Sequence, residues 1–225
     1  MKLQVMLAEF IGTFALIFVG VGAIAADWVV RQGAGSPNLV GIALAHGLTL
    51  SVMISALGAI SGGQFNPAVS LGLLVGGKLN PKAAAGCVIA QCLGAIVAAA
   101  TIKMILPSEV LLQINMGTPG LGEGISIPAG ILLEAILTFF LITVVIGTAV
   151  DARAPKVGGL FIGLTVALDI LIGGPFTGAA MNPARHLGPA LMGGGLSQSA
   201  IYWAGPLIGG AFAGALYRFA FDEKK

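Results

Sequence analysis

Two Asn-Pro-Ala triplets, at residues 66–68 and 182–184, carry the clearest chemistry in this sequence. An Asn side chain can cap free backbone N–H groups, and Pro suits the first helical position because a donor there would have no partner. The sequence therefore predicts two helix starts, headed by the triplets Asn66-Pro67-Ala68 and Asn182-Pro183-Ala184. Their side-chain amides and the partial positive charge of the helix ends would bind a solute oxygen and disfavour cations.

Charged residues inside apolar stretches are the next candidates for function. Arg185 follows the second triplet directly. Its charge would cost roughly 2.5 to 3.5 kcal/mol against lipid, which favours a water-lined position. Glu9 and Glu134 lie near the start of two apolar stretches, where they either support the backbone or carry protons. An intramembrane enzyme or proton-coupled carrier that uses Glu9, Glu134 and Asp169 is disfavoured, because no Ser/His or paired Asp arrangement accompanies them.

The composition indicates a membrane protein. Of the 225 residues, 57% are hydrophobic and 9% are charged, and the mean hydropathy is +1.00. Each apolar run approaches the roughly 20 residues that cross a bilayer as a helix. The predicted spans lie near residues 5–26, 38–60, 82–105, 128–150, 157–174 and 199–221.

Small residues and cysteines refine this prediction. The 35 glycines favour close packing of helices in lipid, above all in the last span. In that span the small residues are Gly205, Gly209, Gly210, Ala213 and Gly214. Cys87 and Cys92 both fall in the third span, so the sequence indicates no disulfide framework, no metal site and no cofactor.

The chain repeats itself. Residues 8–14 match residues 133–139, and each half then continues with two spans, a triplet, a short apolar stretch and a third span. Three spans per half is an odd number, so the halves enter the membrane from opposite sides, as an inverted repeat. We expect one channel domain over residues 1–225, built of repeats 1–105 and 128–225.

The short stretches after the triplets, residues 66–76 and 182–192, cannot cross a bilayer. They predict two half-helices that dip in from opposite faces, where irregular backbone is tolerated beside protein or a watery cavity. The polar segments 27–37 and 106–127 are expected to be extracellular loops.

Basic residues predict the orientation, with both termini in the cytoplasm. Only Arg31 and Lys103 would lie outside, besides Arg185 in its half-helix. The residues expected inside are Lys2, Lys78, Lys82, Arg153, Lys156, Arg218, Lys224 and Lys225. Short termini favour the plasma membrane of a prokaryote.

The paired triplets, with Arg185 after the second, resemble the major intrinsic protein family, which comprises the aquaporins and glycerol facilitators. Gly173-Gly174, residues 181–184 and residues 202–206 are most similar to the plant tonoplast intrinsic proteins. The resemblance implies an all-α membrane fold, with six transmembrane helices, two re-entrant half-helices and a pore in each subunit of a homotetramer.

The resemblance also implies which residues line the pore. By spacing from the triplets, His46, Ile170, Ala179 and Arg185 form its selectivity filter. His46 has a competing interpretation as a packing residue inside the helix bundle. Glu9 and Glu134 would brace the backbone before each half-helix.

Three further residues bear on the predicted filter. Asp169 is charged where relatives often are not, so it either pairs with His46 or Arg185 or is neutral. His186 and Ala190 stand where glycerol facilitators carry Asp and Lys. This difference favours a water channel over a glycerol facilitator.

The sequence thus predicts a passive water channel, not an enzyme. It would also pass ammonia, urea or other small neutral solutes and exclude protons and ions. Its partners would be these solutes and the lipid bilayer, with no nucleic acid. A glycerol facilitator of the same fold is the alternative.

Overall fold

The computed structural model describes residues 2–155 and 157–222, and within these residues it contains helices and no strands. Six helices are long and apolar enough to cross a membrane, which confirms the six predicted spans. They are α1 (Leu3–Val30), α2 (Leu39–Ser61), α4 (Pro81–Ile105), α6 (Ile127–Val145), α7 (Gly158–Thr177) and α9 (Ser199–Leu216). Single π-helical turns, Ile146–Val150 and Tyr217–Phe221, extend α6 and α9.

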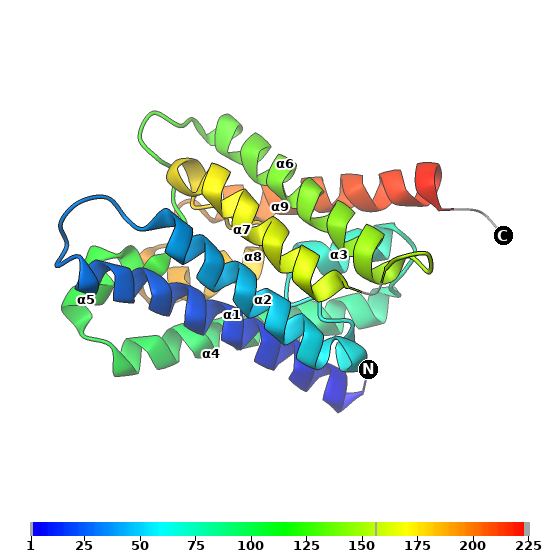
Figure 1. Ribbon diagram of the computed structural model, residues 1–225, viewed down its shortest axis with the longest axis horizontal. Helices are drawn as coiled ribbons and strands as arrows, with labels where there is room; N and C mark the ends of the chain where they lie inside the picture. Colours follow the sequence, from blue (N-terminus) through cyan, green and yellow to red (C-terminus); the bar gives the residue numbers. More distant parts are fainter. Residues whose placement is uncertain (1, 156, 223–225) are drawn as a thin grey trace.

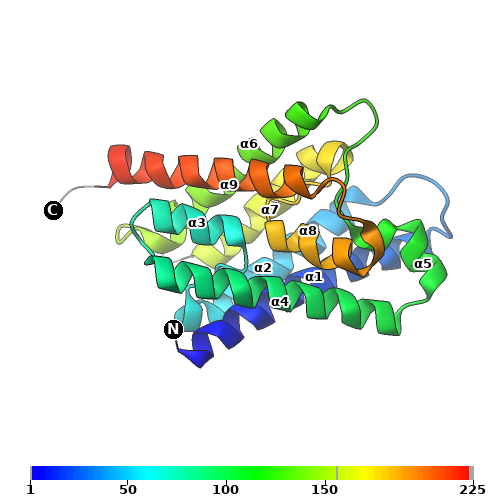
Figure 2. The same cartoon turned by 180° about the vertical axis from the view of Figure 1, so that it is seen from behind.

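Two short helices lie inside this bundle. They are α3 (Pro67–Val75) and α8 (Pro183–Pro189), of 9 and 7 residues. Figure 2 shows them in line with one another, between α4 and α9. Each begins with Pro after an Asn cap, which confirms both predicted helix starts. A π-helical turn, Ala190–Gly194, continues α8.

The long helices pack in matching pairs from the two halves of the chain. Helix α1 packs on α4 and on α2, just as α6 packs on α9 and on α7. The two halves then meet where α2 lies along α7 (Figure 1).

Glycines let the backbones of these helices touch. The α-carbon of Gly209 on α9 lies directly against the carbonyl of Ala135 on α6, where a Cβ would overlap that oxygen. Gly214, five residues further on, faces the carbonyl of Gly72 on α3 in the same way. The close packing predicted for the last span is therefore confirmed, and it presses α9 onto both a long helix and a half-helix.

The predicted loop over residues 106–127 is partly helical, which the sequence did not indicate. It contains α5 (Ser108–Gln113) and a 3-10 turn, Asn115–Gly117. Val110 and Leu111 are buried, so apolar packing holds this helix in place. Six residues are too few for a helical period to show in the sequence. The other predicted loop, residues 27–37, is shorter than expected, because α1 continues through its first four residues to Val30.

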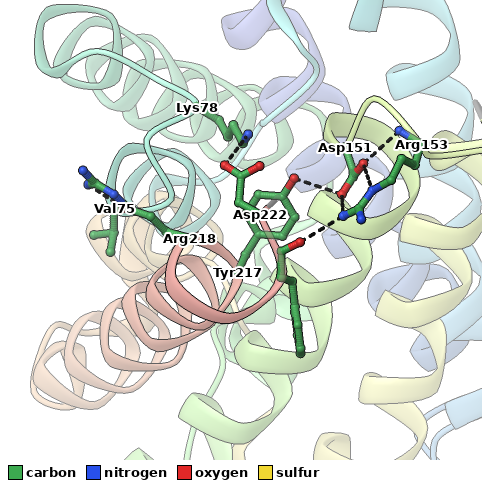
Figure 3. A network of polar contacts seen from close by, with 8 residues as sticks. Val75, Lys78, Asp151, Arg153, Tyr217, Arg218 and Asp222 are labelled. Atoms are coloured by element: carbon green, nitrogen blue, oxygen red, sulfur yellow. Dashed lines mark hydrogen bonds and ion pairs between the residues drawn. The ribbon is translucent and has the colours of Figure 1, made fainter. Parts of the chain in front are cut away.

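The start of α1 and the end of α9 lie at one end of the bundle (Figure 1), which we call the terminal end. Polar contacts join three segments there (Figure 3). Lys78, after α3, pairs with Asp222 at 2.9 Å, and Tyr217 donates a 2.9 Å hydrogen bond to Asp151. Arg153 pairs with Asp151 at 2.7 Å and donates to the Phe221 carbonyl. The ends of α3, α6 and α9 are thereby tied together.

These contacts shift two pKa values. The hydrogen bond to Asp222 raises the pKa of Lys78, and the hydrogen bonds from Arg153 lower the pKa of Asp151. Since the folded-state pKa of Asp151 is lowered, its contribution to stability is present at neutral pH and is lost as the pH falls through that value. Of the basic residues assigned to the same side, Lys156, Lys224 and Lys225 lie outside the described residues.

Candidate functional site

The two Asn side chains meet at the centre of the bundle and bind across it. Asn66 Nδ2 donates to the carbonyl of Met181 at 2.9 Å, and Asn182 Nδ2 donates to the carbonyl of Phe65 at 2.9 Å. Each Oδ1 caps its own helix, accepting from the N–H of Ala68 or of Ala184. Each amide has a second N–H that these two bonds do not use. Both Asn residues line the cavity beside them.

The backbone before each half-helix has an unusual conformation. Phe65 and Met181, which precede the two Asn residues, have positive φ angles of 49° and 51°. Ala179 has a φ of 45°. Non-glycine residues rarely adopt such angles, and each costs of order 1–3 kcal/mol unless its surroundings enforce it.

Glu134 is one of the groups that hold this backbone. Its side chain is fully buried and accepts from the N–H groups of Ala180 and Met181 at 2.9 and 2.7 Å. It also accepts from Thr177 Oγ1 at 2.7 Å. Because the carboxylate aligns two successive N–H groups, it fixes the direction of the chain into Asn182.

Glu9 does the same for the first half-helix. It accepts from the N–H groups of Gln64 and Phe65 at 3.0 and 2.7 Å and from Ser61 Oγ at 2.6 Å. Gln91 adds a fourth bond at 2.7 Å. The acceptors and donors of the two halves correspond one to one except for Gln91, which the sequence did not single out.

Two cavities run through the bundle beside these residues. The inner cavity, of about 30 Å³, is lined by both Asn residues and by apolar side chains such as Leu141 and Val166. The outer vestibule, of about 640 Å³, is lined in part by Ser36 and Pro37 before α2 and by residues 117–120 after α5. These connections lie at the end of the bundle opposite to the terminal end (Figure 1). The inner cavity is large enough to hold water molecules.

The predicted filter residues lie where the two cavities adjoin. His46, Ile170 and Arg185 line both cavities, and Ala179 lines the inner one. The structure therefore brings together all four residues that the family resemblance implied. They come from α2, α7, the loop before α8, and α8 itself.

Arg185 is buried, and its guanidinium is hydrogen-bonded to the segment that follows α5. Nη1 donates a 2.7 Å hydrogen bond to the carbonyl of Gly117, in the 3-10 turn after α5. The backbone N–H of Arg185 is capped by Asn182 at 3.3 Å. The unforeseen ordered turn at residues 115–117 is thus what positions the guanidinium in the cavity wall.

His46 is held by a hydrogen bond within its own helix. Its Nδ1 lies 2.8 Å from the carbonyl of Ile42, one turn earlier on α2, and a nitrogen facing a carbonyl must carry the proton. In the neutral ring, Nε2 is then an acceptor, and it has no hydrogen-bond partner among the described residues. Donor Arg185 and acceptor His46 are therefore both present at this junction.

Neither proposed partner of Asp169 is found. Among the residues that the structure describes, Asp169 makes no ion pair with His46 or Arg185, and its buried Oδ2 has no hydrogen-bond partner. His186 stacks on Tyr202, with ring centroids 4.5 Å apart, and lines neither of the two cavities that Arg185 lines.

Cys87 and Cys92 both lie on α4, as predicted, and neither lines the inner cavity or the outer vestibule. Cys87 is 1% exposed. We therefore expect mercury reagents to inhibit transport weakly and slowly. Inhibition of water flux can be followed by stopped-flow light scattering. Rapid and complete block that a Cys87→Ser variant abolishes would contradict this placement.

Comparison with known proteins identifies the family. Residues 1–217 match the family model described as Major intrinsic protein. Aquaporin TIP2-3 of Arabidopsis thaliana is 42% identical over 225 residues, covering 98% of this chain and 88% of that protein. Aquaporin TIP4-4 of Zea mays is 42% identical over 219 residues, covering 95% of this chain and 85% of that protein.

A solved structure shares the fold. The X-ray structure of the aquaglyceroporin from Plasmodium falciparum superposes with a TM-score of 0.81 at 26% identity, covering 96% of each chain. Six spanning helices, two half-helices that meet at their Asn caps, and these relatives lead to one conclusion. The chain is a multi-pass integral membrane protein that belongs to the major intrinsic protein family.

Proposed function

We propose that the protein is a passive transmembrane channel for water and small neutral solutes. The observation that carries the proposal is the narrow cavity beside Asn66 and Asn182, which continues past Arg185 into the wide outer vestibule. Water-sized molecules fit this cavity, and mainly apolar walls let them pass without binding tightly. The TIP-type relatives, which are named aquaporins, support the same function.

Exclusion of ions and protons follows from the polar groups on the path. The N-termini of α3 and α8 face one another and carry partial positive charge, so a cation meets an electrostatic barrier there. A water bonded to the amides of Asn66 and Asn182 is oriented away from its neighbours, which interrupts proton transfer along the file. Arg185 adds a full charge at the filter.

Ammonia and urea belong to the proposed solute range. The junction combines the donor Arg185 with the apolar side chain of Ile170, which suits small neutral solutes that accept a hydrogen bond. Glycerol is the alternative main solute. The structural similarity to an aquaglyceroporin is the reason to test it.

A proton-coupled carrier or an enzyme is the poorer proposal. Glu9 and Glu134 are engaged with two backbone N–H groups each, which supports a bracing role in place of proton transfer. Asp169 lines neither the inner cavity nor the outer vestibule. No group of three or more His, Cys, Asp or Glu side chains suited to a metal ion occurs in the described chain.

The proposal extends to architecture and assembly. Donors and acceptors around Glu9 and Glu134 recur in both halves, which supports two inverted repeats, 1–105 and 128–225, in one domain. Exposed apolar side chains such as Leu44, Phe176 and Phe212 suit lipid or a neighbouring subunit, as a homotetramer requires. Both termini would face the cytoplasm. The plasma membrane is not supported by the TIP-type relatives, so the membrane that houses the channel is to be found by localisation.

The decisive experiment is stopped-flow light scattering on proteoliposomes. We expect the protein to raise osmotic water permeability several-fold over empty vesicles, with a low activation energy and no proton conductance. Parallel runs with glycerol, urea and ammonia rank the solutes. Unchanged shrinkage of vesicles that contain folded protein would overturn the channel proposal.

Ile170→His tests the proposed filter. The added ring fills space at the junction of the two cavities, so urea and ammonia fluxes should fall by a larger factor than water flux. Both permeabilities are measured in one vesicle preparation. Leu168→His, which places the same side chain on the exposed face of α7, is the matched control. An unchanged solute-to-water ratio in Ile170→His would remove residue 170 from the constriction.

A further inference from the structure

Helix α1 presents a row of three residues to the transport path. Leu16 lines the inner cavity and Ile24 lines the outer vestibule. Gly20 lies midway between them, and residues four apart share one face of a helix. At the level where the two cavities adjoin, α1 therefore offers no side chain.

The ring of His46 fills the place that a side chain at position 20 would take. A Cβ built on Gly20 would overlap His46 Nε2, and it would lie 2.7 Å from Cδ2 and 2.9 Å from Cε1. Unbonded carbon atoms do not approach so closely, and these are the nearest atoms to that position. The imidazole thus rests directly on the backbone of α1.

Backbone geometry does not explain the glycine. Gly20 lies inside the regular helix α1, where Ala would be favoured by about 1 kcal/mol over Gly. Its neighbour Gly22 has no atom within 4 Å of an added Cβ. The requirement for a missing side chain is therefore specific to position 20 and arises from the ring.

The position of the ring is also restrained by a hydrogen bond within α2. Its Nδ1 is bound to the carbonyl of Ile42, which fixes the imidazole toward the start of α2. Ile170 and Arg185 lie on the remaining sides of the junction. A methyl group at position 20 must therefore push the ring toward these two residues, into the path.

We propose that Gly20 determines the width of the filter. Because it has no side chain, the His46 ring can pack against the backbone of α1 and stay out of the transport path. The proposal rests on the proposed function, because it assigns a fifth position to the same filter. A larger residue at position 20 converts a urea-permeable filter into a stricter one without any change in the four filter residues.

The test compares Gly20→Ala with Gly22→Ala in proteoliposomes. Gly20→Ala is expected to lower the urea-to-water permeability ratio by about fivefold or more, because a narrow filter loses the wider solute first. Gly22→Ala makes the same change two residues away in open space, and it should leave the ratio unchanged. Equal ratios in the two variants would overturn the proposal.

His46→Ala, alone and combined with Gly20→Ala, identifies the cause. If the ring transmits the effect, the double variant should match His46→Ala, with the loss of urea flux relieved. A loss that persists in the double variant would contradict the proposal. Should His46→Ala alone leave the ratio unchanged, the assignment of His46 to the filter fails instead, which separates the two ideas.

Folding is measured for every variant by size-exclusion chromatography and thermal melting. If Gly20→Ala alone does not fold, the proposal requires that removal of the ring by His46→Ala restores folding. A double variant that also fails to fold would show that Gly20 is needed for another reason.

Discussion

Glu134→Gln is expected to destabilise the folded protein by about 3–5 kcal/mol, the usual cost of breaking a buried charged hydrogen-bond network. Two backbone N–H groups and the Thr177 hydroxyl converge on this carboxylate. The glutamine amide has only one acceptor oxygen. Its NH₂ group would face donors of the protein, with which it cannot form hydrogen bonds. The left-handed conformation at Ala179 and Met181 then loses the contacts that enforce it.

The measurement is the yield of monodisperse protein and its melting temperature in detergent, followed by water permeability per folded channel. Glu9→Gln should behave alike, since four donors face Glu9. Glu123→Gln, an exposed change in the loop before α6, is the control. Well-folded Glu134→Gln protein with abolished, pH-dependent transport would favour a proton carrier.

Arg185→Val is expected to increase cation conductance by at least about a hundredfold. A fixed charge about 5 Å from a permeating cation contributes roughly 3 kcal/mol to the barrier at an effective dielectric constant of 20. The shorter side chain also releases the Gly117 carbonyl, which becomes an acceptor for cations. Larger neutral solutes should pass more readily because the junction widens.

Conductance is measured in planar bilayers, and glycerol flux in vesicles made from the same preparation. Arg218→Val removes an equal charge from the exposed terminal end and should change neither. Arg185→Lys keeps the charge and should exclude cations better than Arg185→Val does. Conductance as low as in the unmodified channel would show that the charge does not form the barrier.

The strongest parts of the fold were predictable because they depend on local properties of the chain. Apolar runs of about 20 residues predicted all six spanning helices, and Asn followed by Pro predicted the starts of α3 and α8. The helix α5 was missed, since its six residues are held by packing of Val110 and Leu111 and not by a visible pattern.

The site was predictable only as far as its repeats and family resemblance reach. Those gave the two Glu residues and the four filter positions. They could not give Gln91 as a partner of Glu9, or the turn at Gly117 that receives Arg185, because these contacts join residues 82 and 68 positions apart. The contact between Gly20 and His46 could not be predicted for the same reason, since it joins residues on two different helices.

The crosswise bonds of the two Asn side chains also constrain how the protein is made. Asn66 binds the carbonyl of a residue 115 positions later, and Phe65 offers its own carbonyl to a residue 117 positions later. When the ribosome delivers the first half to the bilayer, neither partner has yet been synthesised. The first half is therefore inserted before these hydrogen bonds can form. Folding of the centre is completed only when the second half has been inserted and packs against the first.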